Sequence, residues 1–305
     1  MRSLLFFFAL LLFVSTYPAH GRQSESVLKK LDQLNKRVNP RLHKLLNKAG
    51  LKYPPTDVYI RVHKFEGIVE LFARNEQSAP FTSVTTYPAY NLPKNYRNDE
   101  LYQFVDAGPK EQQGDIKVPE GIFKILYHNP WSSYHLSLAL GFPNPADAIR
   151  AHQRKVINDK GKRAIMQWWS YHGKTVDKDM IAGIPGVWSN KDAVPAGNEI
   201  FMHGKNVTIG CVPVGDRNIE EIFLLTDPRL VGGTEVHIFP FDFREQKNEA
   251  MRRRYEKLKP WLKEFWSSLE EIHDYFDNTG RLPNIYIDKT TGRYHLNNAK
   301  NRLQY

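Results

Sequence analysis

The stretch on which the prediction of the fold depends reads Ile200-Phe201-Met202-His203-Gly204-Lys205-Asn206-Val207-Thr208-Ile209-Gly210-Cys211-Val212-Pro213. A predicted strand brings His203 to a glycine turn, and a short loop then returns to Gly210-Cys211. A strand–loop–strand of this length can place the two side chains together at the edge of a sheet. We therefore predict a β scaffold with an imidazole and a thiol at its rim.

Cys211 is the only cysteine in 305 residues, so it cannot form an internal disulfide. A single thiol indicates intermolecular pairing, a reactive nucleophile or burial without function. A free thiol has a pKa of about 8.5, so only a few per cent of it is thiolate near neutrality. A neighbouring imidazole would take the proton and later return it to a leaving amine. By residue type alone, an inert buried cysteine and a core histidine remain the alternative.

The loop residues suit this chemistry. Gly210 would let the backbone approach a reacting carbonyl closely. The backbone N–H of Cys211, together with that of Gly210, would stabilise an oxyanion. Thr208 would hold the loop or orient His203, and Gly204 would form the turn.

Outward from this stretch, the chain is rich in predicted strands. From Asp57 apolar residues alternate with polar ones, and a turn at Glu66-Gly67 leads into a second strand at 68–72. Further short strands are predicted at 81–87, 101–105, 122–127, 135–140, 199–203 and 234–239. This pattern is typical of a β-rich sandwich or barrel.

Helical periodicity flanks the strands. Residues 22–55 keep helical spacing, with a predicted break at Pro40 and a stop at Gly50. Asp216 is predicted to cap a further helix. Residues 244–277 read as amphipathic helices that Pro260 separates, before a hairpin at 285–296.

We divide the chain into an export signal, a helical segment, a catalytic domain with an insertion, and C-terminal helices with a hairpin. These parts span residues 1–21, 22–55, 56–241 (insertion at about 152–196) and 242–305. The insertion is rich in Trp and lacks clear periodicity. It is predicted to lie over one side of the β core, either as a lid or substrate wall or as a surface excursion.

The first residues are typical of a secretory signal. A positive start at Met1-Arg2 precedes an apolar run over residues 4–14 and small residues at Ala19 and Gly21. This run is shorter than the roughly 20 residues that cross a bilayer. We predict cleavage near Gly21-Arg22 and a periplasmic or cell-envelope location. A retained anchor is the alternative.

The formal net charge is +10. In an exported protein this charge suits anionic envelope polymers or the carboxylates of peptides. Nucleic acid is the other usual partner of a basic chain, but no DNA- or RNA-binding motif is present. A role in solubility alone is the remaining alternative.

His203-Gly204 and Thr208-Ile209-Gly210-Cys211 resemble the active-site motif of the murein L,D-transpeptidase family with its YkuD-type catalytic domain, especially the YafK-like branch. The likeness covers roughly residues 57–290 and fades in the insertion. It includes Gly108-Pro109-Lys110, residues 113–121, Gly141-Phe142-Pro143-Asn144, the Asp216 helix and residues 236–241.

The resemblance implies a YkuD-type β-sandwich or barrel that acts on peptidoglycan stem peptides. Cys211 resembles the family's nucleophile, which forms a thioester, and His203 resembles its proton donor and acceptor. Gly204, Thr208 and Gly210 match the scaffold of the loop. Many members have His at the position of Ile209 and Arg at that of Pro213. These departures leave open transfer to an amine, hydrolysis as a carboxypeptidase or amidase, or an inactive wall-binding protein.

Two further residues are candidates for substrate binding. Lys117 could meet a substrate carboxylate, and His152 could approach the site. No histidine or carboxylate spacing indicates zinc, so neither a metal nor a cofactor is predicted. The expected partners are stem peptides and an envelope lipoprotein as acceptor.

Overall fold

The computed structural model of the chain describes residues 25–89, 108–172 and 190–297. The predicted export signal and the strand at 101–105 lie outside these residues. Across the described residues, no helix combines the length and the apolar character that a membrane span requires.

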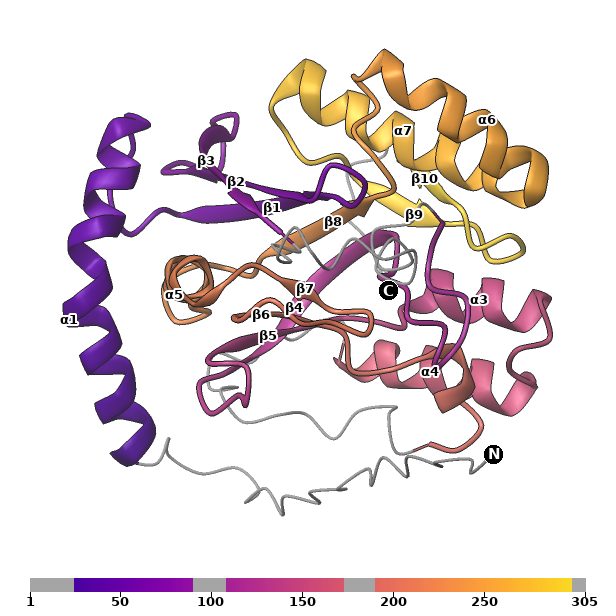
Figure 1. Cartoon of the computed structure of the whole chain (residues 1–305), viewed down its shortest axis with the longest axis horizontal. Coiled ribbons are helices and arrows are strands. Elements are labelled where there is room, and N and C mark those ends of the chain that lie inside the picture. Colours follow the sequence, from indigo (N-terminus) through magenta and orange to yellow (C-terminus); the bar gives the residue numbers. More distant parts are fainter. Residues whose placement is uncertain (1–24, 90–107, 173–189, 298–305) are drawn as a thin grey trace, which may run out of the picture.

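One curled eight-stranded sheet organises a mixed α+β fold (Figure 1). Its strand order is β3-β2-β1-β8-β4-β5-β6-β7. The β1–β8 and β6–β7 pairs are parallel, and the other neighbours are antiparallel. The strands are β1 (Asp57–His63), β2 (Ile68–Arg74), β3 (Thr82–Pro88), β4 (Gly121–Asn129), β5 (Ser137–Leu140), β6 (Phe201–His203), β7 (Val212–Pro213) and β8 (Glu235–Phe239).

Helices surround this sheet (Figure 1). Buried apolar residues of α1 and α5 share one core with the sheet, α3 and α4 share a second with β4 and β5, and α7 shares a third with a small hairpin. These elements are α1 (Glu25–Lys48), α3 (Pro145–Gln153), α4 (Asp159–His172), α5 (Asp216–Leu225), α6 (Glu249–Leu258), α7 (Trp261–Thr279) and the strands β9 (Ile285–Ile287) and β10 (Tyr294–Leu296).

Helix α1 runs unbroken through Pro40, so the predicted break is wrong. The proline removes one backbone N–H, but an apolar stripe on both sides of it is buried against the core. The predicted stop at Gly50 is confirmed. Gly50 has a φ of 74°, its N–H donates to Asn47 O, and the N–H of Leu51 donates to Leu46 O.

Two arginines of α1 dock this helix onto α5. Arg37 Nη2 donates to Glu220 Oε1 at 2.6 Å, and Arg41 Nε donates to Glu221 Oε1 at 2.9 Å. Tyr87 Oη also donates to Glu221 Oε2 at 2.8 Å. Both glutamates are buried, so the arginines supply charge partners that the helix packing would otherwise lack.

The insertion contains a helix, α4, which sequence periodicity missed. Ile165 and Trp169 lie four positions apart and are buried against a core that includes residues of β4 and β5. Trp169 Nε1 donates to Pro143 O at 2.8 Å. In the described residues α4 therefore packs beside β4 and β5, and the predicted roles of the insertion, a lid or substrate wall or a surface excursion, stay predictions. Trp and Lys are mixed along α4, so its apolar face was not legible without the packing partners.

Asp216 is the first residue of α5, and Gly215 occupies the N-cap without a side-chain bond. The predicted cap at Asp216 is therefore wrong by one position. The Asp216 carboxylate instead accepts a hydrogen bond from Lys205 N at 2.7 Å. It thereby ties the loop that follows β6 to the start of α5.

A buried ion pair joins the centre of the sheet to α7. Lys64 Nζ donates to Glu120 Oε1 at 2.8 Å, and also to Gly108 O and Val118 O. Glu120 Oε2 accepts from Trp266 Nε1 at 2.8 Å. The Lys64 and Glu120 side chains are fully buried, so each charge depends on the other.

Replacing Glu120 with Ala should lower the free energy of unfolding by about 3–5 kcal/mol, because the buried Lys64 ammonium would lose the carboxylate that it contacts at 2.8 Å. Urea denaturation followed by circular dichroism measures this loss. The control is Asp32→Ala, which removes the exposed Lys36 pair and should change stability by less than about 1 kcal/mol. Equal small losses in both variants would contradict the role given to the buried pair.

Candidate active site

Paired strands place the predicted imidazole and thiol at the edge of the sheet. β6 ends at His203, and the loop returns to β7, with Met202 opposite Val212 and His203 opposite Pro213. Cys211 precedes β7 and lies beside Phe201, whose N–H donates to its sulfur at 3.4 Å. The strand–loop–strand predicted from the sequence is therefore present.

The His203 ring is held in one orientation. Its Nδ1 donates to Gly204 O at 2.6 Å, which leaves Nε2 without a proton in the neutral ring. The ring lies against Tyr134, with centroids 4.6 Å apart. Burial lowers the pKa of His203, the Gly204 carbonyl raises it, and Lys205 lowers it again. The imidazole is therefore neutral near pH 7 and can accept a proton at Nε2.

The Cys211 thiol is held in its protonated form. Burial raises its pKa to about 11, while the Phe201 N–H and the charge of Lys110 lower it and Glu199 raises it. At pH 7 the thiolate is then on the order of one part in ten thousand. The sulfur also lies 3.9 Å from Glu199 O. In the resting state both the thiol and the imidazole are therefore uncharged.

A direct bond between the two groups is not among the contacts of the described residues. The sulfur lies at Phe201, and His203 lies two residues further along β6, about 6.6 Å along the backbone. The predicted pairing of the two side chains therefore remains a prediction.

Thr208 closes the loop in front of the cysteine. Its Oγ1 donates to Cys211 O at 2.8 Å and accepts from Gly210 N at 3.0 Å. From the sequence, Thr208 was predicted either to hold the loop or to orient His203, and these two hydrogen bonds hold the loop. Because the Gly210 N–H is used here, the N–H of Cys211 is the donor left for an oxyanion in our proposal.

Both predicted scaffold glycines lie where a side chain does not fit. Gly210 has a φ of 136°, and a Cβ there would lie 2.9 Å from Lys117 O. A Cβ on Gly204 would lie 2.6 Å from both Asp216 Oδ1 and Tyr134 O. The backbone carbonyl of Lys117 therefore lies directly against the turn at Gly210 that precedes Cys211.

Lys110 is a residue that the sequence reasoning did not single out. Its ammonium is buried, donates to Asp115 Oδ1 at 2.7 Å and lowers the pKa of the Cys211 thiol. Asp115 also accepts from the N–H groups of Glu111, Gln112 and Lys117, so it caps a turn. The sequence signal that could have identified Lys110 is the Gly108-Pro109-Lys110 segment, which resembles the family pattern.

The other predicted contacts are placed differently. Lys117 touches the site through its backbone carbonyl, which faces Gly210. His152 lies on α3 and pairs with Asp159 at 2.9 Å, and no contact joins it to Cys211 or His203 in the described residues. Both substrate-binding roles remain predictions.

An open hollow of about 350 Å³ lies beside the loop that carries His203. Its lining includes the basic residues Lys205 and Arg217 and the first turn of α5. Ile209, at the tip of the loop, is 79% exposed, so the residue at this position takes no part in the core. The hollow is thus lined by two basic side chains and by Asp216, close in sequence to His203.

Alkylation of Cys211 by iodoacetamide should accelerate about tenfold for each pH unit between pH 7 and pH 10, because only the thiolate reacts and the thiol pKa is about 11. Mass spectrometry of the intact protein measures the rate. A plateau already at pH 8 would contradict this resting state and would mean that the imidazole ionises the thiol without substrate.

Gly210→Ala should lower the free energy of unfolding by about 1 kcal/mol or more, because the residue has a positive φ and faces Lys117 O. Urea denaturation measures the effect. The matched control is Gly232→Ala, since Gly232 has open space around it and no positive φ. If the two variants are equally stable, the close approach at Gly210 is not a constraint.

Comparisons with known proteins agree with the motif resemblance. No family model matches the chain. The chain is 27% identical over 243 residues to the curated Escherichia coli (strain K12) protein "Putative L,D-transpeptidase YafK", across 78% of this chain and 72% of that protein. The curated protein of the same name from Escherichia coli O157:H7 matches equally.

Solved structures show a weaker likeness. The helical cell shape determining protein Pgp2 from Campylobacter jejuni shares 12% identity at a TM-score of 0.37, over 81% of this chain and 80% of that one. A mutant of Pgp2 shares 15% identity at a TM-score of 0.36. That match covers 76% of this chain and 65% of the other, which is just under two thirds of its length. Bd1075 from Bdellovibrio bacteriovorus shares 20% identity at a TM-score of 0.30. That match covers 73% of this chain and 62% of the other. In sequence the chain is therefore similar to YafK, a putative L,D-transpeptidase, as its motifs predict.

Proposed function

We propose that the chain catalyses cysteine acyl transfer on peptidoglycan stem peptides in the cell envelope. The observation that carries this proposal is the position of the motif residues: His203 ends β6, and Cys211 directly precedes β7, which pairs with β6 at the edge of the sheet. The sequence match to YafK, a putative L,D-transpeptidase, supports the same chemistry.

The reaction begins when a donor stem enters beside the loop. Cys211 Sγ attacks the carbonyl of a diamino-acid residue at an L,D centre, and its proton passes to His203 Nε2. The oxyanion accepts a hydrogen bond from the Cys211 N–H. The C–N bond then breaks, the leaving amine takes the proton from His203, and a thioester remains on Cys211.

An acceptor releases the acyl group. A peptidoglycan amine or a lysine of an envelope protein attacks the thioester, a proton passes to His203, and the thiol is restored. Water in place of the amine makes the protein a hydrolase. Lys205 and Arg217 line the hollow beside the loop and suit the carboxylates of stem peptides.

A second candidate is a wall-binding protein whose catalytic segment is inactive. The observation that favours it is the thiol pKa of about 11, together with Ile209 and Pro213 at positions where many relatives carry His and Arg. Such a protein would bind stems through the same basic hollow but would form no thioester.

The test is incubation of the purified protein with muropeptides, followed by mass spectrometry of products and of the intact protein. The proposal expects a stem-sized adduct on the wild type that hydroxylamine removes. New crosslinks indicate transfer, and shortened stems alone indicate hydrolysis. Cys211→Ala should abolish adduct and products, and His203→Ala should slow turnover by about 10²–10⁴-fold.

The matched control is His295→Ala, which removes an imidazole that stacks on Tyr286 in the C-terminal hairpin. Its turnover should equal that of the wild type. Stem binding without an adduct or products in the wild type would rule out the enzyme and favour the wall-binding protein.

A further inference from the structure

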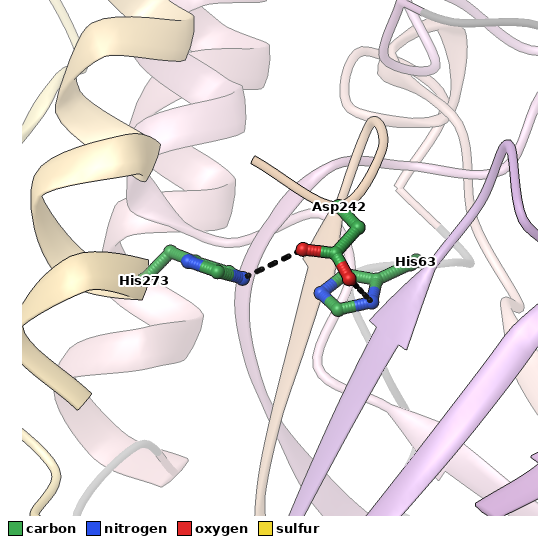
Figure 2. A group of neighbouring side chains, drawn as sticks. All are labelled: His63, Asp242 and His273. Atoms are coloured by element: carbon green, nitrogen blue, oxygen red, sulfur yellow. Dashed lines mark ion pairs between the residues drawn. The ribbon is translucent and has the colours of Figure 1, made fainter. Parts of the chain in front are cut away.

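A second group of chemically competent side chains lies away from Cys211, between the sheet and α7. His63 ends β1, Asp242 follows β8, and His273 lies in the middle of α7. One donor atom from each lies within 4.8 Å of the others. Figure 2 shows the Asp242 carboxylate between the two imidazoles, 3.8 Å from His63 Nδ1 and 3.8 Å from His273 Nε2.

The two imidazoles are buried without hydrogen-bond partners. Both side chains have no exposed surface, and none of their four ring nitrogens forms a hydrogen bond in the described part of the chain. Leaving a buried polar group unsatisfied costs about 1–3 kcal/mol. Buried polar groups in native proteins are rarely left without a hydrogen-bond partner, so these two imidazoles indicate that a ligand binds between them.

The Asp242 carboxylate is fixed in place between the two rings. Arg244 Nε donates to its Oδ1 at 2.8 Å, and Arg244 Nη2 donates to its Oδ2 at 2.6 Å. The ring nitrogens of His63 and His273 form no hydrogen bond in the described part of the chain, so they remain able to bind a cation together with this carboxylate.

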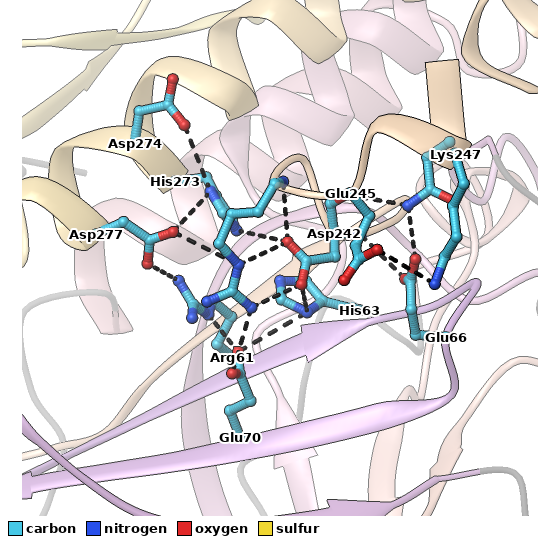
Figure 3. Close-up of polar contacts among 12 residues, drawn as sticks. Arg61, His63, Glu66, Glu70, Asp242, Glu245, Lys247, His273, Asp274 and Asp277 are labelled. Atoms are coloured by element: carbon cyan, nitrogen blue, oxygen red, sulfur yellow. Dashed lines mark hydrogen bonds and ion pairs between the residues drawn. The ribbon is translucent and has the colours of Figure 1, made fainter. Parts of the chain in front are cut away.

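The surrounding ion pairs carry an excess of negative charge (Figure 3). Arg61 donates to Glu70 and Asp277, each at 2.6 Å, and Arg244 donates to Asp242. These two guanidinium groups face three carboxylates. Asp274 adds a fourth carboxylate, 3.6 Å from His273 Nδ1, although its side chain is mostly exposed. The group therefore lacks at least one positive charge.

We propose that His63, Asp242 and His273 bind a divalent transition-metal ion, with zinc as the best fit. Zinc takes neutral imidazole nitrogens at 2.0–2.1 Å and carboxylate oxygens at 2.0–2.2 Å, so neighbouring donors in a tetrahedron lie about 3.3 Å apart. The two 3.8 Å distances run to different oxygens of Asp242, and the three donor atoms lie within 4.8 Å of one another, so the widest gap would have to close by up to about 1.5 Å. The Arg244 bonds to Asp242 would orient this ligand from outside the metal.

The site ties α7 to the sheet. Its ligands come from β1, the segment after β8 and α7, elements distant in sequence. Water would take the fourth position, or Glu70, whose Oε2 lies 3.8 Å from His63 Nδ1. In strand order β1 is separated from β7 by four strands, so the site is distinct from the cysteine loop. Its role is to hold the C-terminal helix on the sheet.

The test measures metal binding by the full, tag-free chain. After zinc loading and desalting, elemental analysis should find one zinc per chain. Cobalt should give the visible absorption of a tetrahedral site. Zinc should raise the melting temperature by several degrees, and a chelator should reverse this shift.

Asp242→Asn and His273→Gln should each weaken zinc affinity at least 100-fold, since each removes a ligand. The control is His237→Gln, which alters an equally buried histidine on β8 that pairs with Glu235 instead and should leave zinc binding intact. The proposal is overturned if the wild type retains no zinc and shows no cobalt spectrum, or if both ligand variants bind as the wild type does. The wild-type spectrum decides the matter even where a variant fails to fold.

Discussion

The ion pair between Lys64 and Glu120 is the interaction on which the rest of the structure depends. Both charges are fully buried, so neither can be hydrated if the other moves away. The Lys64 ammonium also holds the carbonyls of Gly108 and Val118. The segment 108–120 is therefore drawn against the end of β1. The carbonyl of Lys117 in this segment is the surface against which Gly210 turns. The geometry of the cysteine loop thus rests on a charge pair in the core.

A second constraint reaches the loop from its other side. Arg37 and Arg41 hold α1 on α5, and Asp216 at the start of α5 holds the backbone at Lys205. The N-terminal helix is in this way connected, through one helix and one carboxylate, to the residues that follow His203. This connection gives α1 a physical role, because the position of the loop depends on where α5 lies.

The electrostatics of the candidate site favour uncharged groups. Burial acts in opposite directions on an acid and a base: it raises the pKa of the Cys211 thiol and lowers that of His203. A thiolate–imidazolium pair is therefore not the resting state. In the proposed reaction a stem carbonyl lies between the two groups, and the proton moves as the sulfur–carbon bond forms. Such a thiol is protected from chance oxidation, because the thiolate is the reactive form.

By itself, the sequence determined the features that local patterns encode. The alternation from Asp57 predicted β1 and β2, Gly50 predicted the end of α1, and the motif around His203 and Cys211 predicted the strand–loop–strand. Tertiary structure decided what depends on distant neighbours. Helix α1 continues through Pro40 because the core buries both of its halves, and α4 is recognisable only by the surface it covers. The order of strands, the burial that shifts the two pKa values, and the meeting of His63, Asp242 and His273 follow from chain segments far apart in sequence. No local spacing records such contacts, because they form only when the whole sheet and α7 pack together.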